Sequence, residues 1–266
     1  MEIGNPASTH STPAPAAIHL TPPAAPFGAV RLTARWARGG DECRAAQALR
    51  WQVLVAETGA ARPAPPAGAA AGLDVDFFDA HCEHLLLHAS RDDGRAPELV
   101  ATYRLLTPAA ARLVGGLHSE GGFDLLRLRR LRPRMAEVGR ACIAPGWRDA
   151  TTVRHLWDTL AAFLQANELD CAIGCAPVAL RDGGLLAAAL HRHWQSHCAA
   201  PLELQVRPRL PLPLAPPAMR VAPAAPALAQ GWIDRGARLL GAPAWNAESG
   251  HAELPLLLPT PGRAVF

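Results

Sequence analysis

The sequence predicts an α+β domain built on a mixed sheet. Two observations indicate this class: strand-like and helix-like segments alternate from residue 136 to 197, and two strand-like segments separated by a polar hairpin occupy residues 85–106. Alternation of strand and helix favours parallel neighbours, whereas a hairpin joins antiparallel ones. The chain has 266 residues, half of them hydrophobic, which is enough for one large domain or two small ones.

The first half of the chain supplies a strand, a helix and the hairpin. Val30–Trp36 alternates weakly between apolar and polar residues and is the expected first strand. Asp41 can cap a helix that runs to about Glu57. The segments Leu85–Ala89 and Leu99–Leu106 are the expected hairpin strands. The expected buried side of the helix carries Ala45, Ala48, Leu49, Gln52, Val53 and Ala56.

The centre of the chain reads as strand, tight loop and helix. Ala136–Ile143 is short and apolar, and Ala144-Pro145-Gly146 ends it. Asp149, Thr151 and Thr152 can each cap the helix that follows. Its buried face is indicated by apolar residues at helical spacing, which are Val153, Leu156, Trp157, Leu160, Ala161 and Leu164.

The last part of the chain supplies the remaining expected elements. A small strand is expected at Asp170–Ala176, and a helix at Asp182–His197 with Leu185, Leu186, Ala189, Leu190 and His193 inward. The alternation of Leu202, Leu204 and Val206 predicts one further strand before prolines interrupt it. A helix over Ala229–Leu240 ending at Gly241, and a last strand over Ala252–Leu258, complete the series.

Three segments lie outside these elements. Residues 1–28 are rich in Pro, Ala, Ser and Thr and predict a disordered tail, which leaves 29–266 as a single domain. The Ala/Pro-rich insert 59–72 is expected to be a mobile loop that can cover a site. The Pro-rich segment 207–227 cannot be assigned a regular element.

The composition narrows the function classes. All 26 basic residues are arginine, which indicates a coding bias, and the net charge of +3 gives no reason to expect nucleic acid as a partner. The six cysteines form no CxxC pair and suit reduced thiols in a cytosol. We expect a cytoplasmic protein, because the sequence shows neither a signal-peptide pattern nor an apolar run of about 18 residues.

The central unit is the first candidate site. Glu137 and Arg140 lie inside an apolar strand, and the strand leads into a loop and an open helix N-terminus that can attract a phosphate. The alternative is an ordinary strand–loop–helix crossover.

The segment Leu73–His88 is the second candidate site. Asp74, Asp76 and Asp79 stand close to two phenylalanines, a combination that suits an amine ligand, although a solvated acidic turn is the alternative. His81, Cys82 and His84 lack a standard zinc spacing, so structural hydrogen bonding is favoured over a metal.

Arginines supply two further candidates. Arg104 lies within an apolar strand and needs an anionic partner, either one of these aspartates or a substrate. The run RLRRLRPR holds five arginines, which could receive an acidic partner or an anionic membrane surface, or form a plain solvated face. They are Arg127, Arg129, Arg130, Arg132 and Arg134.

Several ordered blocks resemble one known family. The segments AAQALRWQVLVAETGA, DVDFFDAHCEHLLL, LVATYRLL, HSEGGFDL, EVGRACIAPGWRD and LDCAIGCA resemble the ornithine N-alpha-acyltransferases of ornithine-lipid synthesis, which belong to the GNAT acyltransferase superfamily. The block GWIDRGARLLGAPAWNAESGHAELPLLL resembles the C-terminal block of that family. Acyl-homoserine-lactone synthases share DxFD, YRLL and ExxR, but SEGGFD, GCA and GAPAWN favour the ornithine-lipid family.

The resemblance implies a three-layer GNAT-like domain, with a mostly antiparallel central sheet and helices on both faces. It also implies a reaction in which a 3-hydroxyacyl group moves from acyl carrier protein to the α-amine of L-ornithine and gives lyso-ornithine lipid. The phosphopantetheine thioester would be a co-substrate, and no permanently bound cofactor or metal is expected. The enzyme would contact the inner membrane face without spanning it.

The resemblance also implies roles for individual residues. Glu137 is the expected base, acting directly or through water, while Asp76 and Asp79 would bind the amines of ornithine. Arg104 and Arg140 would hold its carboxylate or the acyl chain, or orient Glu137. Glu137 and Arg140 share a site only if a β-bulge falls near Gly139, where backbone N–H groups would also stabilise the oxyanion.

The carrier side of the site has its own candidates. Arg148, Ala150, Thr151 and Thr152 would take the phosphopantetheine phosphate, and the arginines from Arg127 to Arg134 would dock the carrier protein. Ala150 stands where a GNAT loop usually has glycine, which puts this phosphate site in question. The alternatives are another carrier-dependent N-acyltransferase, such as an acyl-homoserine-lactone or acyl-amino-acid synthase, and a non-catalytic relative that binds carrier protein or membrane.

Overall fold

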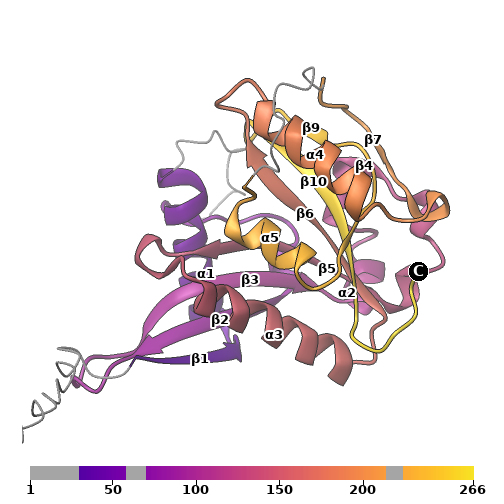
Figure 1. Ribbon diagram of the computed structural model, residues 1–266. Coiled ribbons are helices and arrows are strands. Elements are labelled where there is room, and N and C mark those ends of the chain that lie inside the picture. The colour runs from indigo at the N-terminus through magenta and orange to yellow at the C-terminus, as the bar shows by residue number, and fades with distance from the viewer. Residues whose placement is uncertain (1–29, 58–69, 214–223) are drawn as a thin grey trace, which may run out of the picture.

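A computed structural model describes residues 30–57, 70–213 and 224–266. Its main feature is an eight-stranded mixed sheet in the order β1-β2-β3-β5-β6-β10-β8, with β9 paired to β10 (Figure 1). All neighbours run antiparallel except β5 and β6, which are parallel. The strands are β1 (Arg31–Trp36), β2 (Glu83–Ser90), β3 (Glu98–Leu106), β5 (Met135–Ile143), β6 (Cys171–Ala179), β8 (Arg238–Leu239), β9 (Ala244–Asn246) and β10 (His251–Pro259). A separate two-stranded sheet pairs β4 (Phe123–Asp124) with β7 (Arg207–Pro208).

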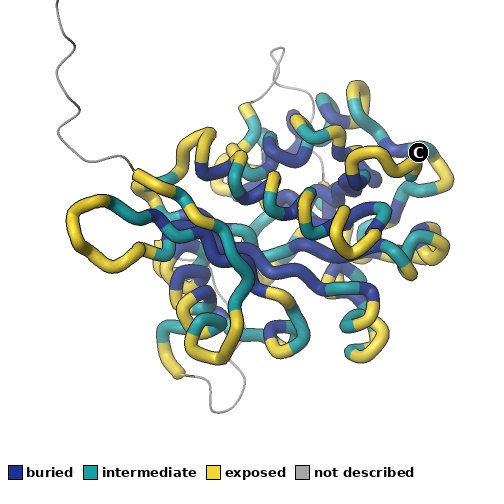
Figure 2. The backbone as a smooth tube through the Cα atoms, turned by 90° about the horizontal axis from the view of Figure 1, so that it is seen from below, coloured by how far each residue is buried: buried dark blue, intermediate teal, exposed yellow. Residues whose placement is uncertain are grey.

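Helices cover both faces of the sheet (Figure 1). On one face, Leu156, Leu190 and Trp232 pack into the largest core cluster. They come from α3 (Ala150–Ala166), α4 (Leu185–His197) and α5 (Ala227–Ile233). On the other face lie α1 (Gly40–Trp51) and α2 (Pro108–Leu113). Long runs of buried residues lie in the strands β2, β3, β5 and β10, and Figure 2 shows such buried stretches through the middle of the molecule. The predicted α+β class, mostly antiparallel with helices on both faces, is confirmed.

Most predicted elements of the central unit are confirmed. The strand at Ala136–Ile143 is β5, and the helix that follows is α3 with Asp149 as its N-cap. Its buried face consists of Thr152, Val153, Leu156, Trp157, Leu160 and Leu164, because apolar residues at this spacing share one side of a helix.

The prediction for the first helix needs two corrections. Its N-cap is Gly39, and Asp41 lies in the first turn. The buried residues of α1 are Ala46, Leu49 and Arg50, while Ala45 and Ala48 are exposed. The helix then continues as one π-helical turn, η1 (Gln52–Ala56), which buries Val53.

Three predictions in the second half are wrong. Leu185 is 42% exposed rather than inward, because it opens α4. The expected strand at Leu202–Val206 is the 3₁₀ turn η7 (Leu202–Leu204), which follows Pro201. The expected helix over Ala229–Leu240 ends at Ile233 as α5, because Gly236 adopts a left-handed φ of 84° and the chain turns into β8.

The predicted tail 1–28 lies outside the described residues, as do residues 59–69 of the insert 59–72 and residues 214–223 of the Pro-rich segment 207–227. Within the described ranges, no helix combines the length and the apolar character needed to cross a bilayer.

Candidate active site

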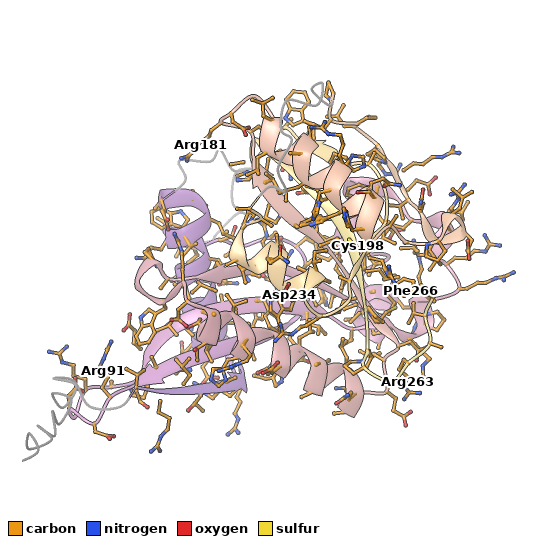
Figure 3. All side chains as sticks on the ribbon, viewed as in Figure 1. Arg91, Arg181, Cys198, Asp234, Arg263 and Phe266 are labelled. Atoms are coloured by element: carbon orange, nitrogen blue, oxygen red, sulfur yellow. The ribbon has the colours of Figure 1, made fainter. Side chains whose placement is uncertain are left out.

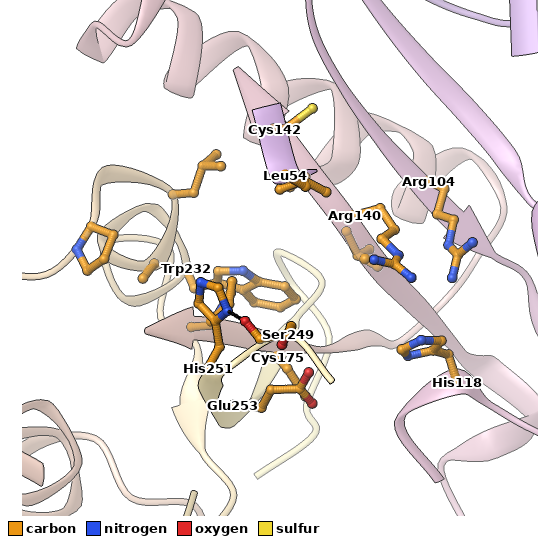
Figure 4. Close-up of a pocket in the computed structure, with 18 of the residues that line it drawn as sticks. Leu54, Arg104, His118, Arg140, Cys142, Cys175, Trp232, Ser249, His251 and Glu253 are labelled. Atoms are coloured by element: carbon orange, nitrogen blue, oxygen red, sulfur yellow. Dashed lines mark hydrogen bonds between the residues drawn. The ribbon is translucent and has the colours of Figure 1, made fainter. Parts of the chain in front are cut away.

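The site is a cavity at the point where β5 and β6 separate. Their parallel pairing covers only Met135–Glu137 on β5, and both strands continue beyond it without pairing to each other. A cavity of about 430 Å³ opens there (Figure 4). It is lined by β5 and β6 and by residues of α5, η1 and the β9–β10 hairpin.

Glu137 is buried on β5, as predicted, and its carboxylate is held by the turn η3 (His118–Gly121). Its Oε2 accepts a hydrogen bond from the backbone N–H of His118 at 2.6 Å. Its Oε1 accepts one from the N–H of Ser119 at 2.7 Å and another from the Ser119 hydroxyl. Because a carboxylate offers about four acceptor positions, one position on Oε2 remains for a ligand. Glu137 also lines the cavity.

A β-bulge brings Arg140 to the same cavity. Thr102 pairs with Cys142 and Arg104 with Gly139, so two residues of β5 stand opposite one residue of β3. Arg140 is one of these two and adopts a left-handed φ of 53°. The bulge expected near Gly139 is therefore present, and both Glu137 and Arg140 line the cavity.

The buried end of an ion-pair network lies behind the cavity. Arg50 on α1 is fully buried, with its Nε 3.0 Å from Asp74 and its Nη2 2.6 Å from Asp79. Its Nη1 also lies 3.4 Å from Nδ1 of His84, whose Nε2 is 2.9 Å from the carbonyl oxygen of Asp79. Since arginine only donates, His84 accepts at Nδ1 and donates at Nε2. Burial lowers the pKa of His84 and favours this neutral form.

The front of the same network faces the cavity. Arg104 is 4% exposed and pairs with Asp79 at 2.9 Å and with Asp76. Arg140 pairs more loosely, at 3.3 Å from Asp76 and 3.7 Å from Asp74. Arg104 and Arg140 line the cavity, so each joins the network to the open space. Of the two kinds of partner expected for Arg104, the aspartate is present. The contact between Arg104 and a substrate stays a prediction.

The ion-pair network gives the acidic cluster a structural role. Asp76 and Asp79 are ion-pair partners of arginines, and neither lines the cavity. Burial disfavours the charged form of Asp76, but the hydrogen bond and charge of Arg104 outweigh it and hold its pKa below the ordinary value. The predicted contact between these two aspartates and the amines of a substrate stays a prediction. No group of three His, Cys, Asp or Glu side chains suited to a metal occurs in the described ranges.

The start of α3 is already capped by a carboxylate. One oxygen of Asp149 accepts hydrogen bonds from the N–H groups of Thr151 at 2.8 Å and Thr152 at 2.9 Å. Ala150 is exposed as the first residue of the helix, and neither it nor the two threonines lines the cavity. A phosphate at this position has to compete with Asp149 for the same N–H groups.

Arg148 reaches the cavity but is tied to the first helical segment. Its guanidinium forms two hydrogen bonds to Glu57, at 2.7 and 2.5 Å, and its Nε donates to the carbonyl oxygen of Ile143 at 3.1 Å. The hydrogen bond from Arg148 lowers the pKa of Glu57. Arg148 therefore lies at the rim of the cavity in a fixed orientation.

The arginine run divides into two groups. Arg127 donates to the carbonyl oxygen of Leu202 at 2.7 Å, and Arg132 pairs with Glu120. Arg134 pairs at 3.1 Å with Asp170, which also lies 3.9 Å from Arg263, a residue near the C-terminal end (Figure 3). These three arginines join parts of the structure to one another.

Arg129 and Arg130 form the second group. Both are exposed, and within the described chain neither forms an ion pair. Of the five arginines predicted to receive a carrier protein, these two have their charges turned to solvent.

Among the cavity residues that the sequence reasoning missed are Ser119, Cys175, Asn246 and Glu253. Cys175 on β6 lies 3.9 Å from the Ser119 hydroxyl, and Glu253 on β10 accepts a hydrogen bond from Asn246 at 2.7 Å. All four line the cavity or bind Glu137. A signal was available for Glu253, which is a single acid inside the otherwise apolar strand at the C-terminal end.

Comparison with known proteins finds a domain similarity over part of the chain. The profile of the acetyltransferase (GNAT) domain matches residues 49–158, a range that contains Arg104, Glu137 and Arg140. This part of the chain is similar to acetyltransferase (GNAT) domains. The matched range contains the bulged strand β5, whereas β6 lies beyond it.

Curated proteins that are similar to this chain share one name. The chain is 39% identical over 147 residues to an L-ornithine N(alpha)-acyltransferase of Rhizobium meliloti, and 34% identical over 163 residues to one of Rhodobacter capsulatus. These matches cover 54% and 60% of this chain. They cover 49% and 62% of the relatives, so the chain spans less than two thirds of either. The resemblance to this family is confirmed.

Among solved structures, FeeM, an N-acyl amino acid synthase from uncultured soil microbes, is similar at a TM-score of 0.49 and 12% sequence identity. That match covers 88% of this chain and 93% of the other.

Proposed function

We propose that the protein transfers a 3-hydroxyacyl group from acyl carrier protein to the α-amine of L-ornithine, giving lyso-ornithine lipid. The observation that carries the proposal is the cavity at the splay of β5 and β6, where a buried carboxylate and two arginines meet an apolar channel. The names of the curated relatives support ornithine as the acceptor.

Glu137 serves as the base in this proposal. The α-amine must be neutral to attack the thioester carbonyl, so a proton has to leave it. The free acceptor position on Oε2 of Glu137 takes that proton directly or through one water. The three hydrogen bonds from η3 fix the direction of the carboxylate, and Glu137 lines the cavity.

Arg140 is the residue best suited to the carboxylate of ornithine. Arg104 is committed to two aspartates, whereas the contacts of Arg140 to Asp76 and Asp74 are long. The Nε of Arg140 is buried and has no hydrogen-bond partner in the described structure. Its guanidinium thus retains donors for a substrate carboxylate, which accepts bidentate pairs from arginine.

The acyl donor occupies the apolar part of the cavity. Leu54, Trp157, Leu228 and Trp232 line it and offer no charge. The pantetheine arm enters between the splayed strands, where the edge of β5 beyond Glu137 is not paired to β6. Arg148, which also lines the cavity, is the cation that this proposal assigns to the phosphate of the arm, a co-substrate group and no resident cofactor.

Arg129 and Arg130 are the docking residues for the acidic carrier protein in this proposal, because rim charges steer association. Changing both to serine should raise the KM for carrier protein about tenfold without changing kcat. Changing Arg127 to serine is the matched control, because its guanidinium binds a backbone carbonyl. An unchanged KM in the double variant would remove this docking surface.

The deciding experiment is mass spectrometry of lipids from a bacterium that lacks ornithine lipids, with and without this gene. A new 3-hydroxyacyl-ornithine supports the proposal. An acyl-homoserine lactone or another acyl-amino acid identifies a different acceptor. No new product from folded protein supplied with carrier protein rejects catalysis and leaves a binding role. Since a one-chain product is amphiphilic, the proposal includes peripheral contact with the inner membrane.

A further inference from the structure

Glu253 is the carboxylate of the cavity that the proposed mechanism leaves unused. It lies on β10, is partly buried and lines the cavity. Figure 4 shows it on a different side of the cavity from Arg104 and Arg140. In the described chain no cation pairs with Glu253, whereas Asp76 and Asp79 are both paired with arginines.

The orientation of Glu253 is set by Asn246. The Oδ1 of Asn246 accepts hydrogen bonds from the N–H groups of Glu248 and Ser249, both at 3.1 Å. These bonds settle which end of the amide is oxygen, so its Nδ2 group donates to Glu253 at 2.7 Å. A partly desolvated carboxylate held in place without a cation is a site for a cationic ligand.

Glu253, Glu137 and Cys175 line the same cavity. Burial raises the pKa of the Cys175 thiol, and the charges of Glu253 and Glu137 both add to the effect. Both carboxylates are therefore within electrostatic reach of the same side chain. The turn at Gly122 also places backbone close to Glu253, since a Cβ there would lie 3.6 Å from its Oε2.

We propose that Glu253 binds the side-chain ammonium of the amino-acid acceptor, so that the cavity selects a diamino acid. The inference rests on the proposed N-acyltransferase function. In this arrangement Arg140 takes the α-carboxylate, Glu137 the α-amine and Glu253 the distal ammonium. An acceptor without a second amine leaves Glu253 unpaired and binds less well.

The test compares ornithine with norvaline, which has the same carbon chain and no side-chain amine. The wild-type enzyme should prefer ornithine in kcat/KM by about 10- to 100-fold, the range of a hydrogen bond to a charged group. Glu253→Gln should lower that preference about as much, with kcat/KM for norvaline nearly unchanged. Asn246→Ala keeps the charge but frees the carboxylate, so it should lower the preference partly. Glu98→Gln, at the exposed start of β3, is the matched control.

The outcomes test the role of Glu253 and the proposed acyltransferase function separately. Retention of the full preference in Glu253→Gln overturns the inference and leaves the acyltransferase standing. Equal use of ornithine and norvaline by the wild-type enzyme does the same. A wild-type protein that acylates no amino acid overturns the proposed function together with the inference. If Glu253→Gln does not fold, the partial loss expected in Asn246→Ala decides the matter.

Discussion

Replacing Glu137 by glutamine separates its two tasks, accepting hydrogen bonds and accepting a proton. The amide oxygen of glutamine can still accept from the N–H and hydroxyl of Ser119. Its NH₂ group then faces the N–H of His118, so the 2.6 Å bond is lost and that donor is left unpaired. A hydrogen bond to a charged group contributes about 1.5–3 kcal/mol. For a domain of this size, that loss lowers the Tm by roughly 3–12 °C.

The effect on turnover should be larger than the effect on stability. A positioned base contributes about 10²- to 10⁴-fold to rate, so kcat for Glu137→Gln should fall by that factor at a temperature where the variant is folded. The assay follows acyl-ornithine formation, with circular dichroism as the check on folding. Ser119→Ala is the control, because it removes one hydrogen bond and keeps the carboxylate. A kcat for Glu137→Gln within about twofold of wild type would refute Glu137 as the base.

Three further predictions follow from buried groups. Asp79→Asn should lower the free energy of unfolding by about 3–5 kcal/mol in urea titrations, because Arg50 and Arg104 lose a shared counter-ion, and a loss below about 1 kcal/mol would contradict the network. The pKa of Asp76 is lowered in the folded protein, so its charge stabilises the fold at pH values above the pKa of an unfolded Asp, which is about 4. That contribution is lost as pH falls through the folded pKa, and the stability gap between wild type and Asp76→Asn should therefore close in acid; a constant gap would count against it. Burial raises the pKa of Cys175, so the thiol is uncharged at neutral pH, and Cys175→Ala should keep kcat within about threefold. If the wild type shows a burst of acyl-enzyme and Cys175→Ala does not, the thiol carries the acyl group and the prediction is wrong.

The central unit was predictable because local signals agree there. β5 is bounded by a Pro-Gly break, and α3 combines a side-chain cap with regular apolar spacing. The bulge followed from the need to bring Glu137 and Arg140 to one face. Its cause is visible only in the pairing with β3, where one residue of that strand faces two of β5.

The predicted buried face of the first helix includes Leu49 and Val53, which are buried, but it omits Arg50. Arg50 is fully buried, and the helix turns so that Arg50 reaches Asp74 and Asp79. Those partners are more than twenty residues away in sequence. No local pattern contains this information, since tertiary ion pairs decide which side of the helix is inward.

The predictions for the late segments were wrong for a different reason. Alternating Leu202, Leu204 and Val206 have the period of a strand, but Pro201 starts a 3₁₀ turn in which Leu202 is 70% exposed. The positive φ of Gly236 likewise ends a helical pattern that the apolar residues would have continued. Backbone conformation overrides side-chain periodicity at both places.

The left-handed backbone at Arg140 has a consequence for the evolution and engineering of this protein. Arginine at a φ of 53° is disfavoured by about 1–2 kcal/mol relative to glycine, for which that conformation costs little. Selection for thermal resistance alone should therefore return glycine or asparagine at position 140, and those clones should be more stable and poorly active. Improvement of one property at this position is expected to work against the other, so a library screened for heat tolerance should hold residue 140 fixed.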